Sequence, residues 1–556
     1  MLALNVLILV LLGVVSSSDL DLELAETGTI VVETSNGAVR GSYGVRNHVD
    51  SKILYWFRSI PFAEPPVGAR RFEPPVPKEN WSGILDTRSK PPICIQGSSN
   101  VTGSEDCLYL KIFSNKQPKA TNKLPVLVWI YGGAYWSGHA DFDDHSPDFL
   151  LHEDVIVVGI HYRVGFMGFF SLGDEVVPGN NGIRDQVLAL KWIKENIRNF
   201  GGDPDNIAIW GQSAGAASVA YLLQIEETKG LFSKAILNSG SSLSPWALAR
   251  RAPIVSRAIA KELDINNKDS KEILRKLKEV NIETLQQVAS SKMTSEVIGK
   301  NPLQGIAFAP VEEPDHENAI ITGGSYEKLQ NGQFHNVPIM SGYTSLEGYI
   351  DKLAGILRLW LLKYDLNHSL LTPEDLNASG PITRQILGGN IKNRYFGVGT
   401  IAGSNERTMR LIADTQFERP IHEAIRLYSQ KTKVYAYRFS YQGPLWGRTN
   451  RTVDGVGHTE DLGYLFDLGF KGSDQDYLVR NRMVRMWTNF VKTGNPTPTQ
   501  DRLLQNVKWP ANTGSEDLQY LEINEDLTVT GLPNADNMNY WRNMYKNYGR
   551  QPFHTF

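Results

Sequence analysis

The sequence predicts an α/β fold in which a central, mostly parallel, twisted sheet carries helices and helical insertions. Two continuous apolar runs, Leu124 to Ile130 and Val155 to Ile160, have the length and composition of strands buried on both faces. A third β-branched run, from Ile207, ends in Gly-Gln-Ser-Ala-Gly and is followed by an alanine-rich helical stretch. Strand and helix alternate in this half of the chain, which is typical of a doubly wound sheet.

Earlier segments supply the first part of this sheet. Thr29 to Val39 alternates with period two and predicts an opening hairpin. Leu54 to Phe62 and Cys107 to Phe113 are also strand-like. Asp185 to Asn196 has the apolar period of an amphipathic helix.

The second half continues the alternation but contains two helical insertions. The insertions are predicted over Pro253 to Met293 and over Lys352 to Ala413, where Pro373 and Pro381 interrupt the helical runs. The remaining predicted elements are strands at Ala235 to Gly240, Val337 to Gly342, Val434 to Tyr441, Leu518 to Ile523 and Leu527 to Val529, and a helix at Met483 to Lys492. No repeat or low-complexity linker divides them, so we expect one domain over residues 19–556.

Composition and the N-terminus limit the classes of function. The chain has 556 residues and a formal net charge of −3, a balance that does not suggest binding to nucleic acid or to an anionic membrane surface. Leu2 to Val15 is almost purely apolar and is followed by Ser16-Ser17-Ser18. This pattern predicts a signal peptide at residues 1–18 and a secreted, extracellular protein, with an N-terminal anchor helix as the alternative. No later run approaches the length of a membrane span.

In a secreted chain, the two cysteines can form a disulfide and the glycosylation sequons can carry glycan. Cys94 and Cys107 would form one local disulfide, and a buried reduced pair is the alternative. Five sequons are present, of which we expect some to carry glycan: Asn80, Asn100, Asn367, Asn377 and Asn450.

The Gly-Gln-Ser-Ala-Gly turn predicts a nucleophilic serine. A strand that turns sharply into a helix would hold the Ser213 hydroxyl at the top of the sheet, beside the N–H groups of a helix N-terminus. Glycines two residues before and after it would let strand and helix nearly touch. Because such a pentapeptide also arises by chance, the prediction depends on a base, a carboxylate and an oxyanion site elsewhere in the chain.

The chain contains candidates for the carboxylate and the base, and they follow Ser213 in the order acid, then histidine. Glu347 follows the strand that starts at Val337, and His458 lies on a glycine-rich loop. A surface glutamate and a loop histidine without a role are the alternatives for these two residues. Gly132-Gly133, directly after the run ending at Ile130, would allow close backbone approach to a bound carbonyl.

Over nearly its whole length the chain resembles the type-B carboxylesterases, the family of carboxylesterases and cholinesterases. The segments that carry the resemblance are Phe200 to Ile207 with Ser213-Ala214-Gly215, Glu105 to Leu110, Ile60 to Pro66 with Arg71-Phe72, Tyr162 to Gly165, Asn181-Gly182 with Asp185-Gln186, and Met486 to Phe490 with Thr493 to Pro496.

This resemblance implies the α/β-hydrolase fold and a role for each matched residue. Ser213 would be the nucleophile, His458 the general base and acid, and Glu347 the carboxylate that orients the histidine. The N–H groups of Gly133, Ala134 and Ala214 would form the oxyanion hole, and Cys94 and Cys107 match the family's first disulfide. Arg71 with Glu105, and Arg163 with Asp185, match ion pairs of the scaffold. The implied activity is hydrolysis of carboxylic esters through an acyl-enzyme, without metal or organic cofactor.

Four departures bear on the substrate. Tyr131 replaces a histidine common in carboxylesterases, Ala134 replaces the third glycine of the oxyanion loop, and Gln212 replaces the glutamate common before the nucleophile. The loop from Ile95 to Asp106 has no tryptophan, so the aromatic platform for a quaternary ammonium is missing and cholinesterase activity is disfavoured.

We therefore expect a small hydrophobic ester as substrate. Gln212 matches the form of the motif described for insect juvenile hormone esterases, and a broad detoxifying or odorant-degrading esterase is the competing interpretation. A non-catalytic adhesion homologue, or a ligand-binding protein with a slow triad, is the alternative outside enzymes. The sequence carries no signal for oligomeric state.

Overall fold

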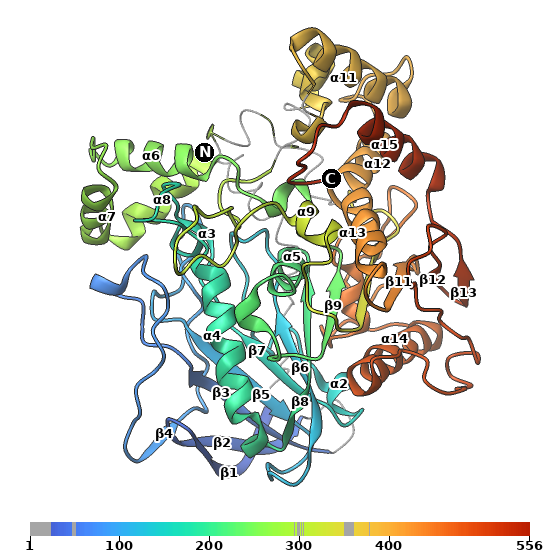
Figure 1. The fold of residues 1–556 in the computed structure, drawn as a ribbon. Coiled ribbons are helices and arrows are strands. Elements are labelled where there is room, and N and C mark those ends of the chain that lie inside the picture. Colours follow the sequence, from blue (N-terminus) through green and yellow to red (C-terminus); the bar gives the residue numbers. More distant parts are fainter. Residues whose placement is uncertain are drawn as a thin grey trace.

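The computed structural model describes residues 24–46, 52–293, 295–296, 301, 303, 305–349, 361–376 and 378–556. The proposed signal peptide and Asn377 lie outside these residues. Figure 1 shows one large twisted sheet that runs from β1 at the lower edge of the view to β13 at the right. Among the described helices, none is both long and apolar enough to cross a bilayer.

The strands form a single sheet whose centre is parallel. Their spatial order is β1-β2-β3-β5-β7-β6-β8-β9-β10-β11-β12-β13, and β4 pairs with β2. From β7 to β12 neighbouring strands are parallel, and the remaining pairs on the main path are antiparallel. The strands are β1 (Leu24–Thr34), β2 (Gly37–Arg46), β3 (Ile53–Pro61), β4 (Ile84–Asp86), β5 (Tyr109–Ser114), β6 (Leu124–Ile130), β7 (Ile156–Ile160), β8 (Gly202–Gln212), β9 (Lys234–Asn238), β10 (Ile339–Thr344), β11 (Val434–Phe439), β12 (Tyr520–Ile523) and β13 (Leu527–Thr530).

Continuous apolar sequence explains the central strands. Every residue of β7, β9 and β10 is buried, as expected for strands covered by helices on both faces. The predicted mostly parallel sheet is confirmed, and most predicted strands agree with the observed ones to within about two residues. The strand below Ser213 is longer than predicted, because β8 begins at Gly202 in a polar stretch with no strand pattern.

Helices cover the sheet and form the insertions. The α-helices are α2 (Asp148–Leu151), α3 (Gly165–Phe169), α4 (Asn181–Asn196), α5 (Ala214–Leu222), α6 (Ala252–Glu262), α7 (Ser270–Glu279), α8 (Ile282–Met293), α9 (Ser325–Gln330), α11 (Pro381–Phe396), α12 (Asn405–Ile412), α13 (Arg419–Ser429), α14 (Asp474–Thr493) and α15 (Ala535–Tyr548). In Figure 1, α6, α7 and α8 lie together on one side of the molecule, and α11 stands at the top. These are the two predicted insertions.

Two helix boundaries differ from the prediction for identifiable reasons. Pro381 does not interrupt a helix but begins α11, because its missing N–H is harmless in the first turn. α14 begins nine residues before the predicted Met483, at a capping box in which the side chains of Ser473 and Asp476 each accept from the other's backbone N–H. The described helices α9, α13 and α15 lie outside the predicted elements.

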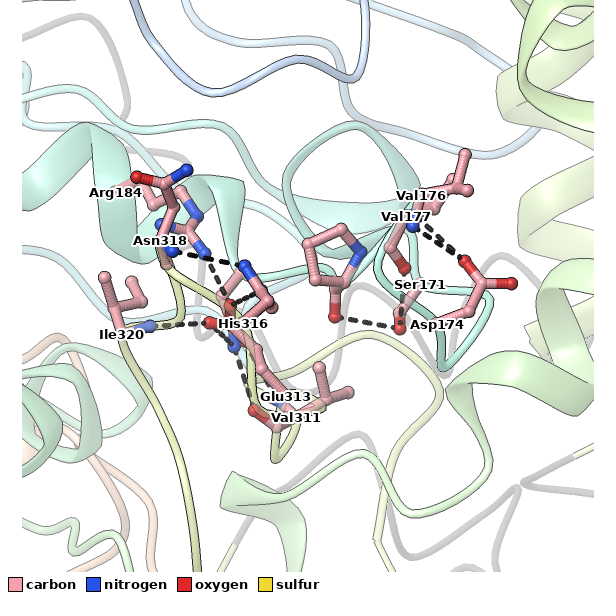
Figure 2. A network of polar contacts seen from close by, with 12 residues as sticks. Ser171, Asp174, Val176, Val177, Arg184, Val311, Glu313, His316, Asn318 and Ile320 are labelled. Atoms are coloured by element: carbon pink, nitrogen blue, oxygen red, sulfur yellow. Dashed lines mark hydrogen bonds and ion pairs between the residues drawn. The ribbon is translucent and has the colours of Figure 1, made fainter. Parts of the chain in front are cut away.

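A buried polar network attaches the segment around residues 311–320 to the start of α4 (Figure 2). The fully buried Glu313 side chain accepts from Asn180 Nδ2 at 2.8 Å and from Arg184 Nη2 at 2.5 Å. His316 Nε2 lies 3.1 Å from the second Glu313 oxygen, and Asn180 also exchanges two hydrogen bonds with the backbone of Val311. A buried carboxylate with this many donors fixes the segment firmly.

Candidate active site

Ser213 lies in strained backbone geometry between β8 and α5. Its φ is 58° and its ψ is −123°, a conformation that residues with a side chain rarely adopt. Its backbone N–H donates to Asn238 O at 2.8 Å, and its side chain is almost buried. The sharp turn predicted from Gly-Gln-Ser-Ala-Gly is therefore present.

The two flanking glycines allow this turn. A Cβ on Gly211 would lie 2.2 Å from the Gly215 carbonyl group, and a Cβ on Gly215 would lie 2.0 Å from Ile130 O. No side chain fits at such distances. The pattern of glycines in the motif thus follows from the closeness of β8, α5 and the end of β6.

The loop predicted to bind the oxyanion follows β6 and turns back on itself. Gly133, Ala134 and Tyr135 have φ values of 107°, 54° and 56°. Gly133 O accepts the N–H of Trp136 at 2.9 Å and of Ser137 at 3.1 Å. Within the described residues, the N–H groups of Gly133, Ala134 and Ala214 donate no hydrogen bond to the protein, so all three are available to a ligand.

Glu347 and His458, which are 111 residues apart, are in contact. His458 Nδ1 lies 2.5 Å from Glu347 Oε2. Glu347 is completely buried on the loop after β10, and its other oxygen accepts the N–H of Thr344 at 2.7 Å. The carboxylate accepts at Nδ1, so the neutral imidazole carries its proton there and presents Nε2 as an acceptor.

His458 Nε2 has Gln212, rather than Ser213, as its hydrogen-bond partner. Gln212 Nε2 lies 3.3 Å from His458 Nε2, whereas Ser213 Oγ makes no hydrogen bond to the ring in the described structure. In the tautomer that carries its proton on Nδ1, the amide N–H donates to Nε2. Catalytic hydrogen bonds in ligand-free enzymes are commonly long and tighten when substrate binds.

Phe417, which the sequence motifs did not indicate, packs on the histidine. Its ring centroid is 4.6 Å from that of His458, and the Trp246 ring centroid is 5.7 Å from that of Phe417. Phe417 belongs to a π-helical stretch, Ala413–Glu418, between α12 and α13. π-Helical stretches are rare overall, but those that occur are often located at functional sites. No residue pattern in the sequence predicts one here.

A second buried carboxyl group, Asp461, lies near the Glu347–His458 pair. Asn238 Nδ2 donates to Asp461 Oδ2 at 3.1 Å, and Asn238 O is the acceptor for Ser213 N–H. Burial, reinforced by the charge of Glu347, raises the pKa of Asp461 to about 7. Asp461 thus connects the loop of His458 to the backbone that holds Ser213.

Aromatic side chains pack beside the loop that follows β6. Trp136 stacks on Phe308 at 5.6 Å, and Phe308 contacts Phe166 edge-on at 5.6 Å. All three rings are buried. The segment that carries Phe308 is the one fixed by Glu313, so that network also supports this apolar wall (Figure 2).

The predicted scaffold features are also in place. Cys94 and Cys107 form a disulfide. Arg71 binds both oxygens of Glu105, and Arg163 binds both oxygens of Asp185. The four sequon asparagines that the structure describes are exposed: Asn80, Asn100, Asn367 and Asn450.

One group in the described part of the chain has the residue types of a metal site, but its surroundings oppose a cation. His139, Asp141 and Asp144 place potential ligand atoms within 4.8 Å of one another. Lys90 already forms an ion pair with Asp141, and Lys111 Nζ lies 3.4 Å from the other Asp141 oxygen. The Lys90 ammonium already pairs with Asp141 and would repel a metal ion, so we assign no metal to the group.

Comparison with known proteins identifies the family. Residues 28–541 match the model of the carboxylesterase family. A juvenile hormone esterase of Tribolium castaneum is 32% identical over 512 residues, which cover 86% of this chain and 85% of that protein. An acetylcholinesterase of Bungarus fasciatus is 33% identical over 542 residues, which cover 90% of this chain and 84% of that protein.

A solved structure agrees with both the fold and the family. The juvenile hormone esterase of Manduca sexta, with OTFP covalently attached, has a TM-score of 0.82 and 29% identity, and the match covers 93% of this chain and 100% of that one. Sequence identity alone does not separate the substrates of these relatives, since the hormone esterase and the cholinesterase are equally distant. The chain therefore belongs to the carboxylesterase family and is a carboxylic ester hydrolase with the α/β-hydrolase fold.

Proposed function

We propose that ester hydrolysis proceeds through an acyl-enzyme on Ser213, with His458 and Glu347 completing the triad. Ser213 Oγ attacks the ester carbonyl while His458 Nε2 takes the hydroxyl proton and passes it to the leaving alcohol. Water, activated by the same nitrogen, then releases the acid. The observation that carries the proposal is the contact of His458 Nδ1 with the buried Glu347, which fixes the ring with Nε2 toward the turn of Ser213.

The tetrahedral intermediate would be bound by the three available N–H groups of Gly133, Ala134 and Ala214. Each good donor of this kind contributes roughly 3 kcal/mol to lowering the barrier. The proposal requires that Gln212 release His458 Nε2 when substrate binds.

A fluorophosphonate probe tests the nucleophile. The wild type should be labelled and should turn over a p-nitrophenyl ester, and Ser213→Ala should lose both properties. Ser239→Ala is a matched control, because Ser239 is also buried with a positive φ of 56° at the end of the neighbouring strand. Labelling of the Ser213 variant would overturn the assignment.

The substrate we propose is a small hydrophobic ester, supported by the buried aromatic wall of Trp136, Phe308 and Phe166. Juvenile hormone is the second candidate, favoured by Gln212 at His458 and by the hormone esterases among the relatives. The ratio of kcat/KM for a juvenile hormone to kcat/KM for short acetate esters tests it. A ratio well below one would favour a broad esterase.

We further propose that residues 1–18 are a signal peptide and that residues 19–556 form one secreted, glycosylated domain. Participation of all described strands in one sheet supports the single domain. The disulfide suits an oxidising compartment, and the exposure of four sequons permits glycan attachment.

A further inference from the structure

Loop 132–138, which follows β6 and contains Gly133 and Ala134, has a backbone conformation that side chains disfavour. Ala134 and Tyr135 both have positive φ values, as does Gly133. Such strain persists only where the surrounding structure holds the backbone in place. The contacts at the two ends of this loop therefore decide where its N–H groups lie.

The first end of loop 132–138 is fixed by a pair of tyrosines. Tyr131 Oη donates to Tyr162 O at 2.7 Å, and Tyr162 Oη donates to Tyr131 O at 2.8 Å. The two rings are stacked with their centroids 4.3 Å apart. Because Tyr162 follows β7 closely, this end is attached to the buried centre of the sheet.

The other end of the loop is fixed by the side chain of Gln96. The Gly138 N–H donates to Gln96 Oε1 at 3.0 Å, and Gln96 Nε2 donates to Gly138 O at 3.1 Å. Gln96 Nε2 also donates to Cys94 O at 3.0 Å, and the residue is only 8% exposed. An amide that accepts at one end and donates twice at the other has a single favourable orientation.

Gln96 itself lies in the segment that the Cys94–Cys107 disulfide closes, residues 94–107. The backbone N–H and C=O of Gln96 both bond to the backbone of Thr102, each at 3.0 Å. The next residue, Gly97, accepts a hydrogen bond at its carbonyl oxygen from Gln286 Nε2 of α8 at 2.8 Å. The Gln96 amide is thus held by a closed segment that is attached to its surroundings.

Close backbone contacts connect Gly138 to the nucleophile. A Cβ on Gly138 would lie 2.5 Å from Gly132 O, and a Cβ on Gly132 would lie 3.0 Å from Ser213 Cβ. The two ends of the loop therefore touch each other, and the first end touches Ser213. A displacement of Gly138 would move Gly132 and, with it, the N–H of Gly133.

We propose that Gln96 is a positioning residue for ester hydrolysis: through Gly138 it sets the place of the Gly133 and Ala134 N–H groups relative to Ser213. Without its amide, the N–H and C=O of Gly138 lose their partners and the strained loop loses one of its two attachments. The inference rests on the proposed role of these N–H groups in binding the oxyanion.

Steady-state kinetics with a p-nitrophenyl ester test the role of Gln96. In Gln96→Ala and in Gln96→Glu, kcat should fall about 10- to 100-fold while KM changes by less than about twofold, because displaced donors weaken transition-state binding more than substrate binding. The glutamate variant keeps the volume of the side chain but places an oxygen against Gly138 O and Cys94 O. Its loss of activity would therefore not come from a cavity.

A trifluoromethyl ketone inhibitor reports on the oxyanion hole more directly. Its adduct with Ser213 would place an oxyanion on the same N–H groups, so its affinity should fall by the same factor as kcat/KM in both Gln96 variants. An unchanged affinity beside a reduced kcat/KM would overturn the inference.

Gln286→Ala is the matched control, because Gln286 is also buried and bonds to the same disulfide-closed segment, but at Gly97. Its melting temperature should fall, whereas kcat should stay within about twofold of the wild type. Equal losses of kcat in Gln96→Ala and Gln286→Ala, or an unchanged kcat in Gln96→Ala, would contradict a positioning role of Gln96.

Ser213→Ala separates this inference from the proposed function. If that variant retains esterase activity, the proposed function fails and the positioning role fails with it. If Ser213→Ala is inactive and both Gln96 variants are fully active, the positioning role alone is wrong.

Discussion

At the scale of single residues, Gln212 is the clearest difference between this site and the usual family pattern. The uncharged Gln212 amide lies against His458 Nε2. A glutamate at the same place would put a negative charge beside this nitrogen and favour the protonated ring. The identity of residue 212 should therefore influence the pH range in which the enzyme works.

Gln212→Glu should move the acidic limb of the kcat/KM profile upward by about one pH unit, because a carboxylate beside Nε2 stabilises the imidazolium. The profile with a p-nitrophenyl ester measures this shift. Gln212→Met, which removes the donor without adding charge, should move the limb by less. Identical profiles for the wild type and the glutamate variant would show that the contact has no influence.

Asp461 predicts a second pH effect, on stability. Its pKa is about 7 in the folded protein, against about 3.9 for an unfolded chain. The stability that the neutral carboxyl group contributes is fully present below pH 4 and is lost as the pH rises through 7. Relative to the wild type, Asp461→Asn should gain stability between pH 5 and pH 7, on the order of 1 kcal/mol per pH unit.

Urea unfolding at a series of pH values measures this difference. Asp205→Asn serves as a control, since Asp205 is exposed and its replacement should leave the pH dependence unchanged. A constant difference between the wild type and Asp461→Asn over the same range would contradict a neutral Asp461.

At the scale of elements, the contact of β8 with α5 leaves no space for a methyl group. Gly215→Ala places a Cβ against Ile130 O and should destabilise the fold by about 3 kcal/mol or prevent folding. Gly389→Ala is the matched control: Gly389 lies in α11, an added Cβ there meets nothing, and helix propensity predicts a gain of up to about 1 kcal/mol. Melting temperatures of the two variants should change in opposite directions.

The sequence predicted the elements that follow simple periodicity. Leu124 to Ile130 and Val155 to Ile160 were recognisable because strands covered on both faces need continuous apolar residues. The π-helical stretch before α13 was not, because buried polar residues such as Asp414 and Glu418 interrupt its apolar pattern. These residues are stabilised by Arg410, one and two turns earlier, and by Asn534, more than 100 residues later in the chain. No local pattern reveals the contact with Asn534.

The candidate site also contains residues that the sequence predicts and contacts that it does not predict. Ser213, Glu347 and His458 could be proposed from the sequence because a turn, a post-strand loop and a glycine-rich loop each leave a local pattern. The contacts of His458 with Gln212 and Phe417 were not found, because they depend on how separate segments pack. Asp461 lies three residues after His458, but its burial and raised pKa follow only from the folded chain.

At the scale of the whole molecule, the proposals of secretion and glycosylation make a joint prediction. The full chain expressed in insect cells should accumulate in the medium without residues 1–18, and amidase removal of N-linked glycan should increase its electrophoretic mobility. Replacing exposed Asn80, Asn100, Asn367 and Asn450 by Gln should remove most of that shift. Retention of the uncleaved chain in the membrane fraction would favour the anchor helix instead.

The parallel centre of the sheet has a consequence for how activity is acquired. Glu347 and His458 are 111 residues apart, and Gln212 and His458 are 246 apart, so the site brings together segments separated by large loops. Closing such loops is slow, since their entropy is lost before the contacts form. Recovery of esterase activity after dilution from denaturant should therefore lag behind recovery of helical circular dichroism, and catalysis would report the last steps of folding.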